Sequence, residues 1–482
     1  MPKKSIKKNY IYNLSYQILL ILTPLVTTPY LSRVLGADGV GSVSFAESIV
    51  SYFSLFAVLG ITIYGQREIS YVQDNKEKRT TVFWETKLLE VITSVVVIAV
   101  YIPFALFQEN RTMYLILAIN LLTVTIDVSW LLQGMEEFGK TAIRNILFRI
   151  MNIVFIFLAV KTKDHINRYV FSIVFFNFLC NISMWSYLPE YIGKPKWRTL
   201  RPFRNINTVL SLFIPTIAMQ IYTVLDKTMI GLITKSAFEN GYYEQSIKIS
   251  RMVLTIVTAL GTVMIPRIGF YFEKGEIESV KTLMYRGYRF VWFLGIPLCF
   301  GLIGISSHMV PWFFGPGYEK VIPLLNILCF LILAIGINNV TGMQYLIPTK
   351  RQNLFTLTVL IGAAVNFVFN ALLIPAMQSI GAAIASVAAE TVIALSQLWI
   401  VRKELSSKTI FVSSWHYLLA GGIMLTALKA IGLGLNSTVL NTILLIVIGA
   451  VIYLFVLLLL KDAFFIGNMQ RILSKVVRRK RI

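Results

Sequence analysis

Apolar residues recur along this chain in long runs, each separated from the next by a short polar segment. A helix needs about 20 predominantly apolar residues to cross the hydrocarbon core of a bilayer. Runs of that length begin near Tyr10 and continue almost to the C-terminus, and a sliding window finds about fourteen of them. The pattern predicts an all-α integral membrane protein.

The fourteen predicted spans are separated by connecting segments that are too short to form a sizeable soluble domain. The first and last of these spans lie close to the two ends of the chain. We expect the spans at residues 10–32, 41–64, 83–107, 113–133, 140–161, 168–188, 206–233, 245–266, 287–307, 322–347, 353–375, 379–401, 413–434 and 439–461.

Composition supports a lipid environment. Of the 482 residues, 56% are hydrophobic and 14% are charged, whereas a soluble domain carries about 25% charged residues. The net charge of +22 arises from Lys and Arg in short connecting segments and tails rather than on one folded face. Nucleic acid is therefore not an expected partner.

The basic residues also predict an orientation, because Lys and Arg accumulate in the cytoplasmic connections of membrane proteins. They fall mostly in one alternate set of connections and place both termini in the cytoplasm; the main exception is the loop with Lys161, Lys163 and Arg168. This set comprises the N-terminal lysines, residues 67–79, 194–204, 274–289, 350–351 and 402–403, and the tail at 471–481.

An even number of predicted spans precedes Asn207, so the span beginning there enters from the same side as the first. We therefore expect two parallel six-helix lobes, at residues 1–190 and 206–404. A basic cytoplasmic linker at 191–205 would join them, and residues 405–482 would add a two-helix hairpin with a basic tail.

Cysteine and histidine do not form a recognisable ligand pattern. The three cysteines lie inside apolar runs, where a free thiol behaves as a small hydrophobic group. The three histidines are far apart in the sequence and have no cysteine or carboxylate at ligand spacing. We expect no metal, no cofactor and no disulfide framework.

Four of the carboxylates within predicted spans are candidate functional groups, namely Glu47, Asp127, Asp226 and Glu390. A charge at the centre of a spanning helix costs about 2.5 to 3.5 kcal/mol, so each one requires a partner or a wet cavity. These carboxylates are candidates for cavity or ion-coupling groups. Alternatively, they form the interhelical hydrogen bonds and ion pairs that hold the bundle together.

Six of the cations in or at the ends of predicted spans form a candidate ladder of positive charge along a transport path. Arginine offers a planar donor fork to phosphate oxygens and lysine a mobile point charge, so the ladder favours a phosphate-bearing substrate. The alternative is that long side chains extend to the membrane interface. The six candidate substrate-binding residues are Arg33, Arg144, Arg149, Lys227, Lys248 and Arg251.

Three stretches resemble the polysaccharide-transport branch of the multidrug/oligosaccharidyl-lipid/polysaccharide exporter superfamily, which contains the O-antigen and capsule repeat-unit flippases. They are PYLSRVLGADGVGSVSFAESI from Pro29, WLLQGMEEFGKTAIRN from Trp130, and LDKTMIGL from Leu225 followed by NGYYEQSIKIS from Asn240. The number and placement of spans extend this resemblance over the whole chain.

The resemblance implies a V-shaped pair of six-helix lobes around a central cavity in a bacterial cytoplasmic membrane. The cavity would carry an undecaprenyl-diphosphate-linked oligosaccharide from the inner to the outer leaflet for capsule, O-antigen or exopolysaccharide synthesis. By motif match, the residues expected near this cavity are Arg33, Glu47, Asp226, Lys227 and Lys248.

The same resemblance implies a transporter rather than an enzyme, so we expect no catalytic residue. Membrane lipids are expected partners, a polymerase and other glycan-assembly proteins are candidate partners, and H+ or Na+ are candidate coupling ions. In this hypothesis Arg144 and Arg149 meet the diphosphate first. Lys227, Lys248 and Arg251 then receive it after the lobes rock.

Three other functions stay open at this stage. A flippase for the peptidoglycan lipid precursor would share the extra C-terminal pair, and a cation-coupled drug exporter would share the fold but require a predominantly acidic cavity. A membrane-embedded polymerase or glycosyltransferase would usually carry a large loop or domain outside the membrane, and the sequence contains no connection of that length.

Overall fold

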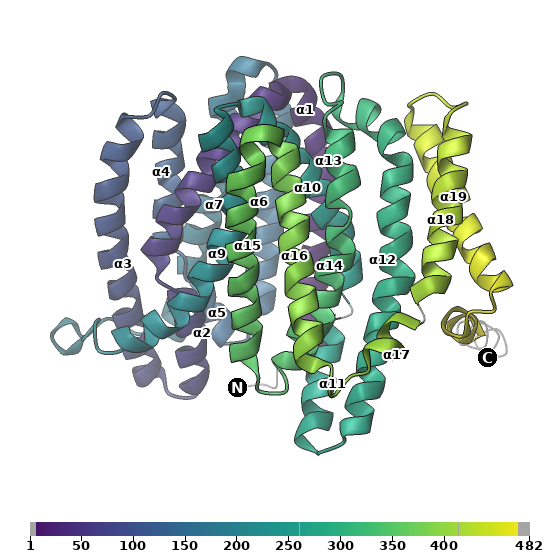
Figure 1. Cartoon of the computed structure of the whole chain (residues 1–482). Coiled ribbons are helices and arrows are strands. Elements are labelled where there is room, and N and C mark those ends of the chain that lie inside the picture. Colours follow the sequence, from purple (N-terminus) through teal and green to yellow (C-terminus); the bar gives the residue numbers. More distant parts are fainter. Residues whose placement is uncertain (1–5, 260, 413, 471–482) are drawn as a thin grey trace, which may run out of the picture. The chain divides into compact units, whose positions relative to one another are not determined.

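The computed structural model describes residues 6–259, 261–412 and 414–470, and within these ranges the chain is helical and contains no β-strand (Figure 1). By residue contacts it divides into two compact units, Met1–Gly241 and Tyr242–Ile482. The all-α architecture predicted from the sequence is therefore confirmed.

The first unit contains nine α-helices in its described part, with 3-10 turns η1 (Lys163–His165), η2 (Trp185–Tyr187) and η3 (Trp197–Thr199) between some of them. The α-helices are α1 (Ile6–Val58), α2 (Ile61–Tyr71), α3 (Lys76–Leu106), α4 (Arg111–Thr125), α5 (Ser129–Gly134), α6 (Phe138–Ala159), α7 (Ile166–Met184), α8 (Leu188–Tyr191) and α9 (Ile206–Thr234).

Helix α1 is divided by Gly36, whose φ of 72° and ψ of 173° are not helical. A straight helix of 53 residues would be about 80 Å long, far more than a hydrocarbon core of about 30 Å. The break lets the chain return, and it falls in the connection predicted between spans 10–32 and 41–64. A side chain at Gly36 would be strained because positive φ is unfavourable for L-residues.

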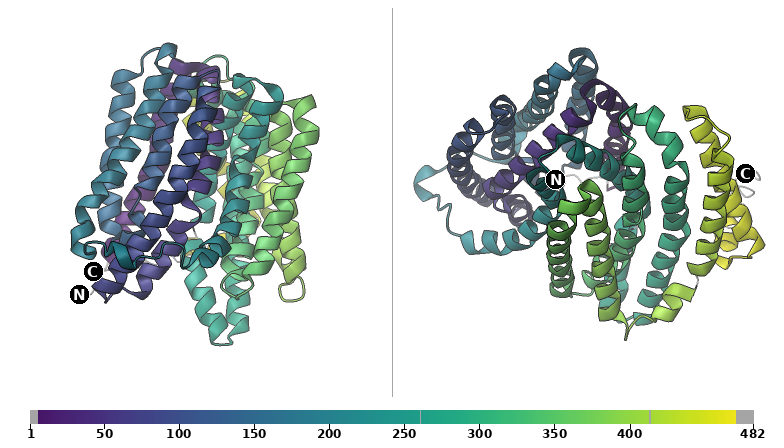
Figure 2. Two further views of the ribbon diagram at one scale, coloured as in Figure 1. Left: turned by 90° about the vertical axis from the view of Figure 1, so that its left-hand side faces the viewer. Right: turned by 45° about the horizontal axis from the view of Figure 1, so that its top comes forward.

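Packing within the first unit follows the apolar faces of its helices. Helix α6 packs against α1 and α7, and α4 packs against α1, α3 and α7. Figure 2 shows the helices of this unit running side by side. One buried cluster centres on Trp130, whose ring stacks on Phe83 at a centroid distance of 5.3 Å, and a second contains Tyr101 and Leu121.

Close backbone contact in the first unit depends on glycine. A Cβ built on Gly41 of α1 would lie 1.7 Å from the carbonyl oxygen of Ala237, and one built on Gly241 would lie 2.0 Å from the carbonyl oxygen of Ala37. Small residues let helix backbones approach in membranes, where helix association depends on van der Waals contact. Because these two positions are glycines, the helix that begins at Ala237 can lie directly against α1.

The second unit begins within the helix that follows α9. Helix α15 packs along α16, and α12 packs against α18 and α19 (Figure 1). The helices are α10 (Ala237–Thr258), α11 (Gly261–Glu273), α12 (Ile277–Phe314), α13 (Val321–Leu328), α14 (Leu331–Asn338), the π-helical η4 (Asn339–Leu346), α15 (Gln352–Met377), α16 (Ser379–Val401), α17 (Ser407–Val412), α18 (Ser414–Gly432) and α19 (Val439–Leu459).

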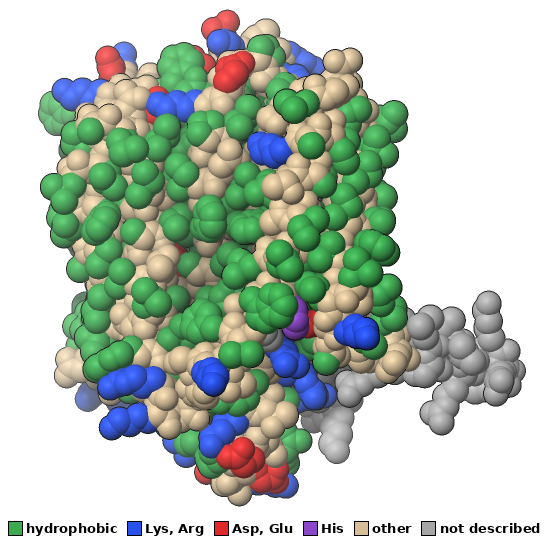
Figure 3. Space-filling view, turned by 45° about the vertical axis from the view of Figure 1, so that its right-hand side comes forward, with side chains coloured by type: hydrophobic (Ala, Val, Ile, Leu, Met, Phe, Trp, Pro, Cys, Tyr) green, Lys and Arg blue, Asp and Glu red, His purple; other side chains and the backbone are tan. Residues whose placement is uncertain are grey.

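The chain is a multi-pass membrane protein. Among the described residues, 11 helices are long and apolar enough to cross a membrane. The face shown in Figure 3 carries hydrophobic side chains across its middle, with charged side chains gathered toward its upper and lower edges. The count of fourteen spans stays a prediction; the residues predicted as the span 245–266 are shared between α10 and α11.

The contact-based division falls after Gly241 rather than in the basic linker at 191–205. The reason is that α9 packs on α1 and α2 and so belongs by contacts to the first unit. The assignment of two six-helix lobes with an added hairpin stays a prediction. The basic tail at 471–481, which enters the orientation prediction, lies outside the described residues.

Candidate functional site

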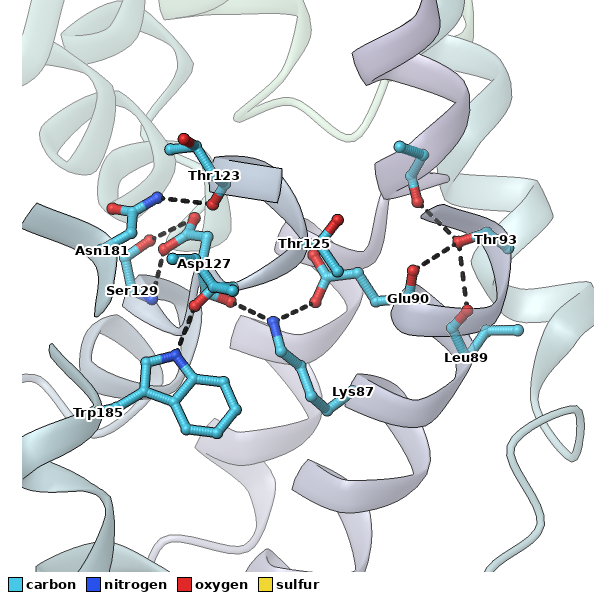
Figure 4. A network of polar contacts seen from close by, with 12 residues as sticks. Lys87, Leu89, Glu90, Thr93, Thr123, Thr125, Asp127, Ser129, Asn181 and Trp185 are labelled. Carbon is cyan, nitrogen blue, oxygen red and sulfur yellow. Dashed lines mark hydrogen bonds and ion pairs between the residues drawn. The ribbon is translucent and has the colours of Figure 1, made fainter. Parts of the chain in front are cut away.

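The first unit contains a buried ion pair between two side chains that lie one turn apart on α3 (Figure 4). Lys87 Nζ lies 2.7 Å from Glu90 Oε2, and the two side chains are 3% and 1% exposed. Lys87 Nζ also donates to the carbonyl oxygen of Asp127 at 2.8 Å. Because both charges are matched inside the helix bundle, the pair contributes no net charge for binding a substrate.

The helix is interrupted between α4 and α5. Side chains from other parts of the first unit satisfy the carbonyl groups that lose their helical partners at this break (Figure 4). Trp185 Nε1 donates to the carbonyl oxygen of Ile126 at 2.7 Å, and Asn181 Nδ2 donates to that of Thr123 at 3.0 Å. Backbone groups without water must be satisfied in this way. The break is therefore a supported feature of the first unit.

Asp127, a candidate cavity carboxylate, lies in this break. Its carboxylate accepts hydrogen bonds from the backbone amide of Ser129 at 2.8 Å and from the Ser129 hydroxyl at 3.0 Å. This is the local side-chain to backbone pattern by which Asp starts a turn or helix. The carboxylate of Asp127 thus forms the turn that leads into α5, and its assignment as a cavity carboxylate stays a prediction.

Helix α6 carries two arginines that make a different set of contacts. Arg144 Nη2 donates to Ser186 Oγ at 2.9 Å, and its guanidinium lies 4.5 Å from the ring centroid of Tyr187. Arg149 Nε donates to Thr23 Oγ1 at 3.4 Å. Within the described part of the chain, neither guanidinium forms an ion pair with a carboxylate, so both retain their full positive charge.

The two arginines lie at different depths along α6. At 1.5 Å per residue, Arg144 is about 9 Å and Arg149 about 16 Å from the start of the helix at Phe138. Both side chains are half-buried, and Arg144 Nε is buried without a hydrogen-bond acceptor. The helix therefore holds two unneutralised cations in sequence along its length.

Lys140, one turn before Arg144, shows the opposite arrangement. Its Nζ lies 2.7 Å from Glu190 Oε2 and donates to the hydroxyl of Tyr191 at 2.6 Å. It also lies 4.9 Å from the ring centroid of Tyr187. The charge of Lys140 is therefore balanced by Glu190, whereas no carboxylate among the described residues balances the charge of Arg144 or Arg149.

The remaining predicted residues of the first unit lie on α1 and α9. Arg33 is exposed and its Nη1 donates to the carbonyl oxygen of Pro29 at 3.2 Å. Glu47 is also exposed, while Asp226 is buried and the neighbouring Lys227 is half-buried. The two helices bring these four residues into the same unit.

In the second unit, Lys248 forms an ion pair with Glu244 one turn earlier on α10, at 3.0 Å. Arg251 is exposed on the same helix, and no ion pair involves its guanidinium within the described residues. Glu390 lies midway along α16 and accepts a hydrogen bond from Asn338, which immediately precedes the π-helical segment η4. Of the predicted residues in this unit, Arg251 alone thus offers an unneutralised cation.

An apolar groove of about 380 Å³ lies in the second unit between α12, α18 and α19. Phe293 and Pro297 line it from α12, Met424 from α18, and Leu445 and Tyr453 from α19. Its lining has the chemistry of a hydrocarbon-binding surface. Nothing in the sequence pattern distinguished this groove from ordinary lipid-facing helix surface.

The sequence reading singled out Arg144, Arg149 and Asp127 but missed Lys87 and Glu90. Their signal was visible, because opposite charges three residues apart in an apolar span lie on the same helical face. What the sequence could not supply was the third partner, the carbonyl oxygen of Asp127, which is 40 residues away along the chain.

Comparisons with known proteins identify relatives with similar sequences. The profile of the polysaccharide biosynthesis protein family matches residues 6–272. A candidate O-antigen transporter of Escherichia coli K12 is 23% identical over 406 residues, covering 83% of this chain and 97% of the relative. A candidate low-salt glycan biosynthesis flippase of Haloferax volcanii is 21% identical over 359 residues, covering 74% of this chain and 75% of the relative.

Solved structures share the fold. The lipid II flippase MurJ in an inward closed conformation superposes with a TM-score of 0.71 at 16% identity, covering 94% of this chain and 99% of that chain. An inward-facing multidrug resistance MATE transporter of the MOP superfamily gives a TM-score of 0.58 at 13% identity, covering 85% and 99%. The predicted all-α fold of the MurJ and MATE type is confirmed, whereas the count of spans and the two six-helix lobes stay predictions.

Proposed function

Because the chain belongs to the polysaccharide biosynthesis protein family, we propose that it translocates an undecaprenyl-diphosphate-linked oligosaccharide repeat unit from the inner to the outer leaflet of a cytoplasmic membrane. Relatives named as O-antigen transporters and as a glycan biosynthesis flippase support a glycan-lipid substrate. Transport of this kind makes and breaks no covalent bond, so no catalytic residue is required.

The observation that carries the proposal is the pair of arginines on α6 whose charge no carboxylate in the described part of the chain neutralises. A diphosphate headgroup is an anion with several oxygen acceptors, and arginine binds such groups through parallel N–H donors. The hydroxyl partners Ser186 and Thr23 orient Arg144 and Arg149 without cancelling their charge. An anionic headgroup is the ligand that this arrangement favours.

The lipid part of the substrate has a matching surface in the second unit. The groove between α12, α18 and α19 is lined almost entirely by apolar side chains. A polyprenyl chain gains about 0.8 kcal/mol for each methylene group removed from water, so it stays with apolar surface and lipid. We assign this groove to the polyprenyl chain while the headgroup and sugars cross through the polar interior.

The proposed cycle alternates access between two lobes, with both termini in the cytoplasm. Arg144 and Arg149 receive the diphosphate from the cytoplasmic leaflet, and Lys227, Lys248 and Arg251 contact it after the lobes move. Arg33 belongs to the same cationic path. Lys248 must exchange its contact with Glu244 for the headgroup during this step.

The membrane potential supplies a driving force in this proposal. Each negative charge that leaves an inside-negative cell releases about 2.3 kcal/mol per 100 mV. A doubly charged diphosphate therefore moves outward downhill without a coupled ion. If H+ or Na+ is coupled to the return step, the candidate carboxylates are Glu47, Asp226 and Glu390.

The direct test uses purified full-length protein in liposomes containing a fluorescent undecaprenyl-diphosphate oligosaccharide. Appearance of the sugar at the opposite leaflet is measured by its accessibility to an externally added glycosidase. The double variant Arg149→Ala with Arg251→Ala should reduce the initial rate at least tenfold. The reason is that the headgroup then loses two charge-assisted contacts, each contributing about 1.5 to 3 kcal/mol.

The matched control replaces two exposed lysines, one between α16 and α17 and one in the first turn of α17, by the variant Lys403→Gln with Lys408→Gln. This control should transport at the wild-type rate. Normal transport by the Arg149 and Arg251 double variant would remove these residues from the path. Efflux of a cationic dye by the wild-type protein, without movement of the glycan lipid, would instead establish the drug-exporter alternative.

A further inference from the structure

The segment at residues 194–204, between α8 and α9, contains five basic residues and no acidic residue. All five are exposed, and in Figure 1 the segment preceding α9 lies beside the lower end of α3. Because it joins two helices of a multi-pass membrane protein, its position is at the level where the spans end. The five residues are Lys194, Lys196, Arg198, Arg201 and Arg204.

Neighbouring carboxylates neutralise only part of this charge. Lys196 forms an ion pair with Glu77 on α3, and Glu85 accepts a hydrogen bond from the backbone amide of Arg201 at 3.0 Å. In the described part of the chain, no ion pair involves the side chains of Lys194, Arg198 or Arg204. The segment therefore presents an uncompensated positive surface.

Residues of this segment also line a pocket. A cavity of about 290 Å³ lies between the first turns of α3 and the linker, and Lys76, Lys194 and Lys196 contribute to its lining. Thr80 and Gly193 hold the two walls together, since Gly193 N donates to Thr80 Oγ1 at 2.8 Å. The pocket thus combines three ammonium groups and one carboxylate, that of Glu77, with a fixed backbone.

Aromatic side chains accompany the charges. Trp84 lines the pocket, its Nε1 donates to the carbonyl oxygen of Gly193 at 3.1 Å, and its ring centroid lies 6.1 Å from that of Trp197. Trp197 is 63% exposed and Phe203 is 55% exposed. Tryptophan rings prefer the headgroup level of a bilayer, where an apolar body and a polar edge are both satisfied.

We propose that the segment 194–204 and the adjoining pocket at the start of α3 form a docking surface for the headgroups of anionic phospholipids. The ammonium and guanidinium groups bind the lipid phosphates, Trp197 and Phe203 insert at the headgroup level, and the pocket lined by Lys76 and Lys194 accepts one headgroup. The surface anchors the linker between α8 and α9 to the membrane.

The chemistry favours a lipid surface over other anions. Exposed aromatic side chains next to the cations gain by contacting acyl chains and glycerol, which a soluble phosphate compound lacks. The cations are spread along eleven residues rather than converging on one point, which suits a layer of separate headgroups. The docking surface is therefore distinct from the arginines of α6, and its test does not depend on the proposed transport function.

The test is a lipid titration of the purified full-length protein monitored by native mass spectrometry. Wild-type protein should retain phosphatidylglycerol in preference to phosphatidylcholine, and raising the ionic strength should reduce this preference. The double variant Arg198→Gln with Arg204→Gln should bind phosphatidylglycerol about thirtyfold more weakly, which corresponds to about 1 kcal/mol per charge. Its phosphatidylcholine binding should not change.

The matched control is again Lys403→Gln with Lys408→Gln, which removes two exposed cations just before and at the start of α17 and should leave the preference intact. The charge-conserving pair Arg198→Lys with Arg204→Lys should keep most of it and shows that the positions tolerate change. Equal loss in the control would overturn the proposal, because any two cations would then suffice. Displacement of phosphatidylglycerol by millimolar inorganic diphosphate would also overturn it and assign the surface to soluble phosphates.

Discussion

Lys87 Nζ and Glu90 Oε2 lie 2.7 Å apart on α3, and both side chains are almost completely buried, whereas Arg149 on α6 donates a hydrogen bond to the hydroxyl of Thr23 and forms no ion pair among the described residues. Lys87 is therefore paired with a carboxylate, whereas Arg149 is paired with none among the described residues. Removing two charges from water is costly even when they pair, so the matched pair has a structural role. The unmatched arginine retains its charge for a ligand.

Breaking the buried pair should destabilise the protein strongly. Glu90→Leu leaves Lys87 buried without a counter-charge, and loss of one partner of a buried pair costs about 3 to 5 kcal/mol. We expect a clear fall in Tm for unfolding in detergent. The double variant Lys87→Met with Glu90→Leu should recover most of this loss because no unpaired charge remains. A double variant as unstable as the single one would contradict the structural role.

Arg149 should respond to substitution according to charge and shape. Arg149→Lys keeps the charge but loses the planar fork, so partial transport is expected, whereas Arg149→Gln loses the charge and should transport at least tenfold more slowly. The measurement is the initial rate of glycan-lipid translocation in liposomes. Equal rates for the Lys and Gln variants would show that the charge of Arg149 is not used.

Gly36 should not tolerate a side chain. Its φ is +72°, and an added Cβ would lie 2.6 Å from Asp38 Oδ1. Left-handed backbone costs an L-residue about 1 to 2 kcal/mol, so Gly36→Ala should lower Tm. Gly422→Ala provides the control, because that position in α18 is helical and nothing lies within 4 Å of the added Cβ. The control should be neutral or stabilising.

Glu404 should make stability depend on pH. Burial acts to raise the pKa of Glu404, but hydrogen bonds from Arg351, at 2.7 and 2.9 Å, and from Tyr345 outweigh burial and hold the pKa below its usual value. A lowered folded-state pKa contributes stability above the unfolded-state pKa of about 4.3. That contribution is lost as the pH falls through the folded-state pKa.

Glu404→Gln should therefore lower Tm at pH 7, and the difference from wild type should shrink toward zero as the pH falls below about 4. The effect is expected to be no more than about 1 kcal/mol, because the carboxylate is 41% exposed and exposed pairs are weak. Glu109→Gln, at an exposed position, should show no such trend. A difference that persists unchanged at pH 3.5 would exclude the ion pair as its cause.

The membrane-spanning pattern was predictable because it depends on local composition. Each apolar run must form a helix to satisfy its own backbone in lipid. The predicted span 379–401 coincides with α16, and the predicted spans 83–107 and 287–307 correspond to the longer helices α3 and α12. The long helix α1 was predicted as two spans, and its break at Gly36 lies between them. The predicted orientation of the termini and the two-lobe division stay predictions.

The candidate site was predictable only by residue type. The sequence identified arginines within spans and the phosphate chemistry that suits them. It could not identify which charges are neutralised, because the partners come from distant parts of the chain: Arg149 meets Thr23 across 126 residues, and Lys87 meets Asp127 across 40. Helical periodicity defines the face on which a side chain lies but not the helix that covers that face.

The amino-acid sequence alone determined that this protein resides in a membrane, that it is helical throughout its spans, and that several of these spans contain Lys or Arg. Those properties follow from the free energy of placing each residue in lipid. Tertiary packing decided that Glu90 neutralises Lys87, that Arg144 and Arg149 keep their charge, and that an apolar groove lies beside α12. These outcomes depend on which helix surfaces meet, since electrostatic matching acts over a few ångströms between side chains that packing brings together.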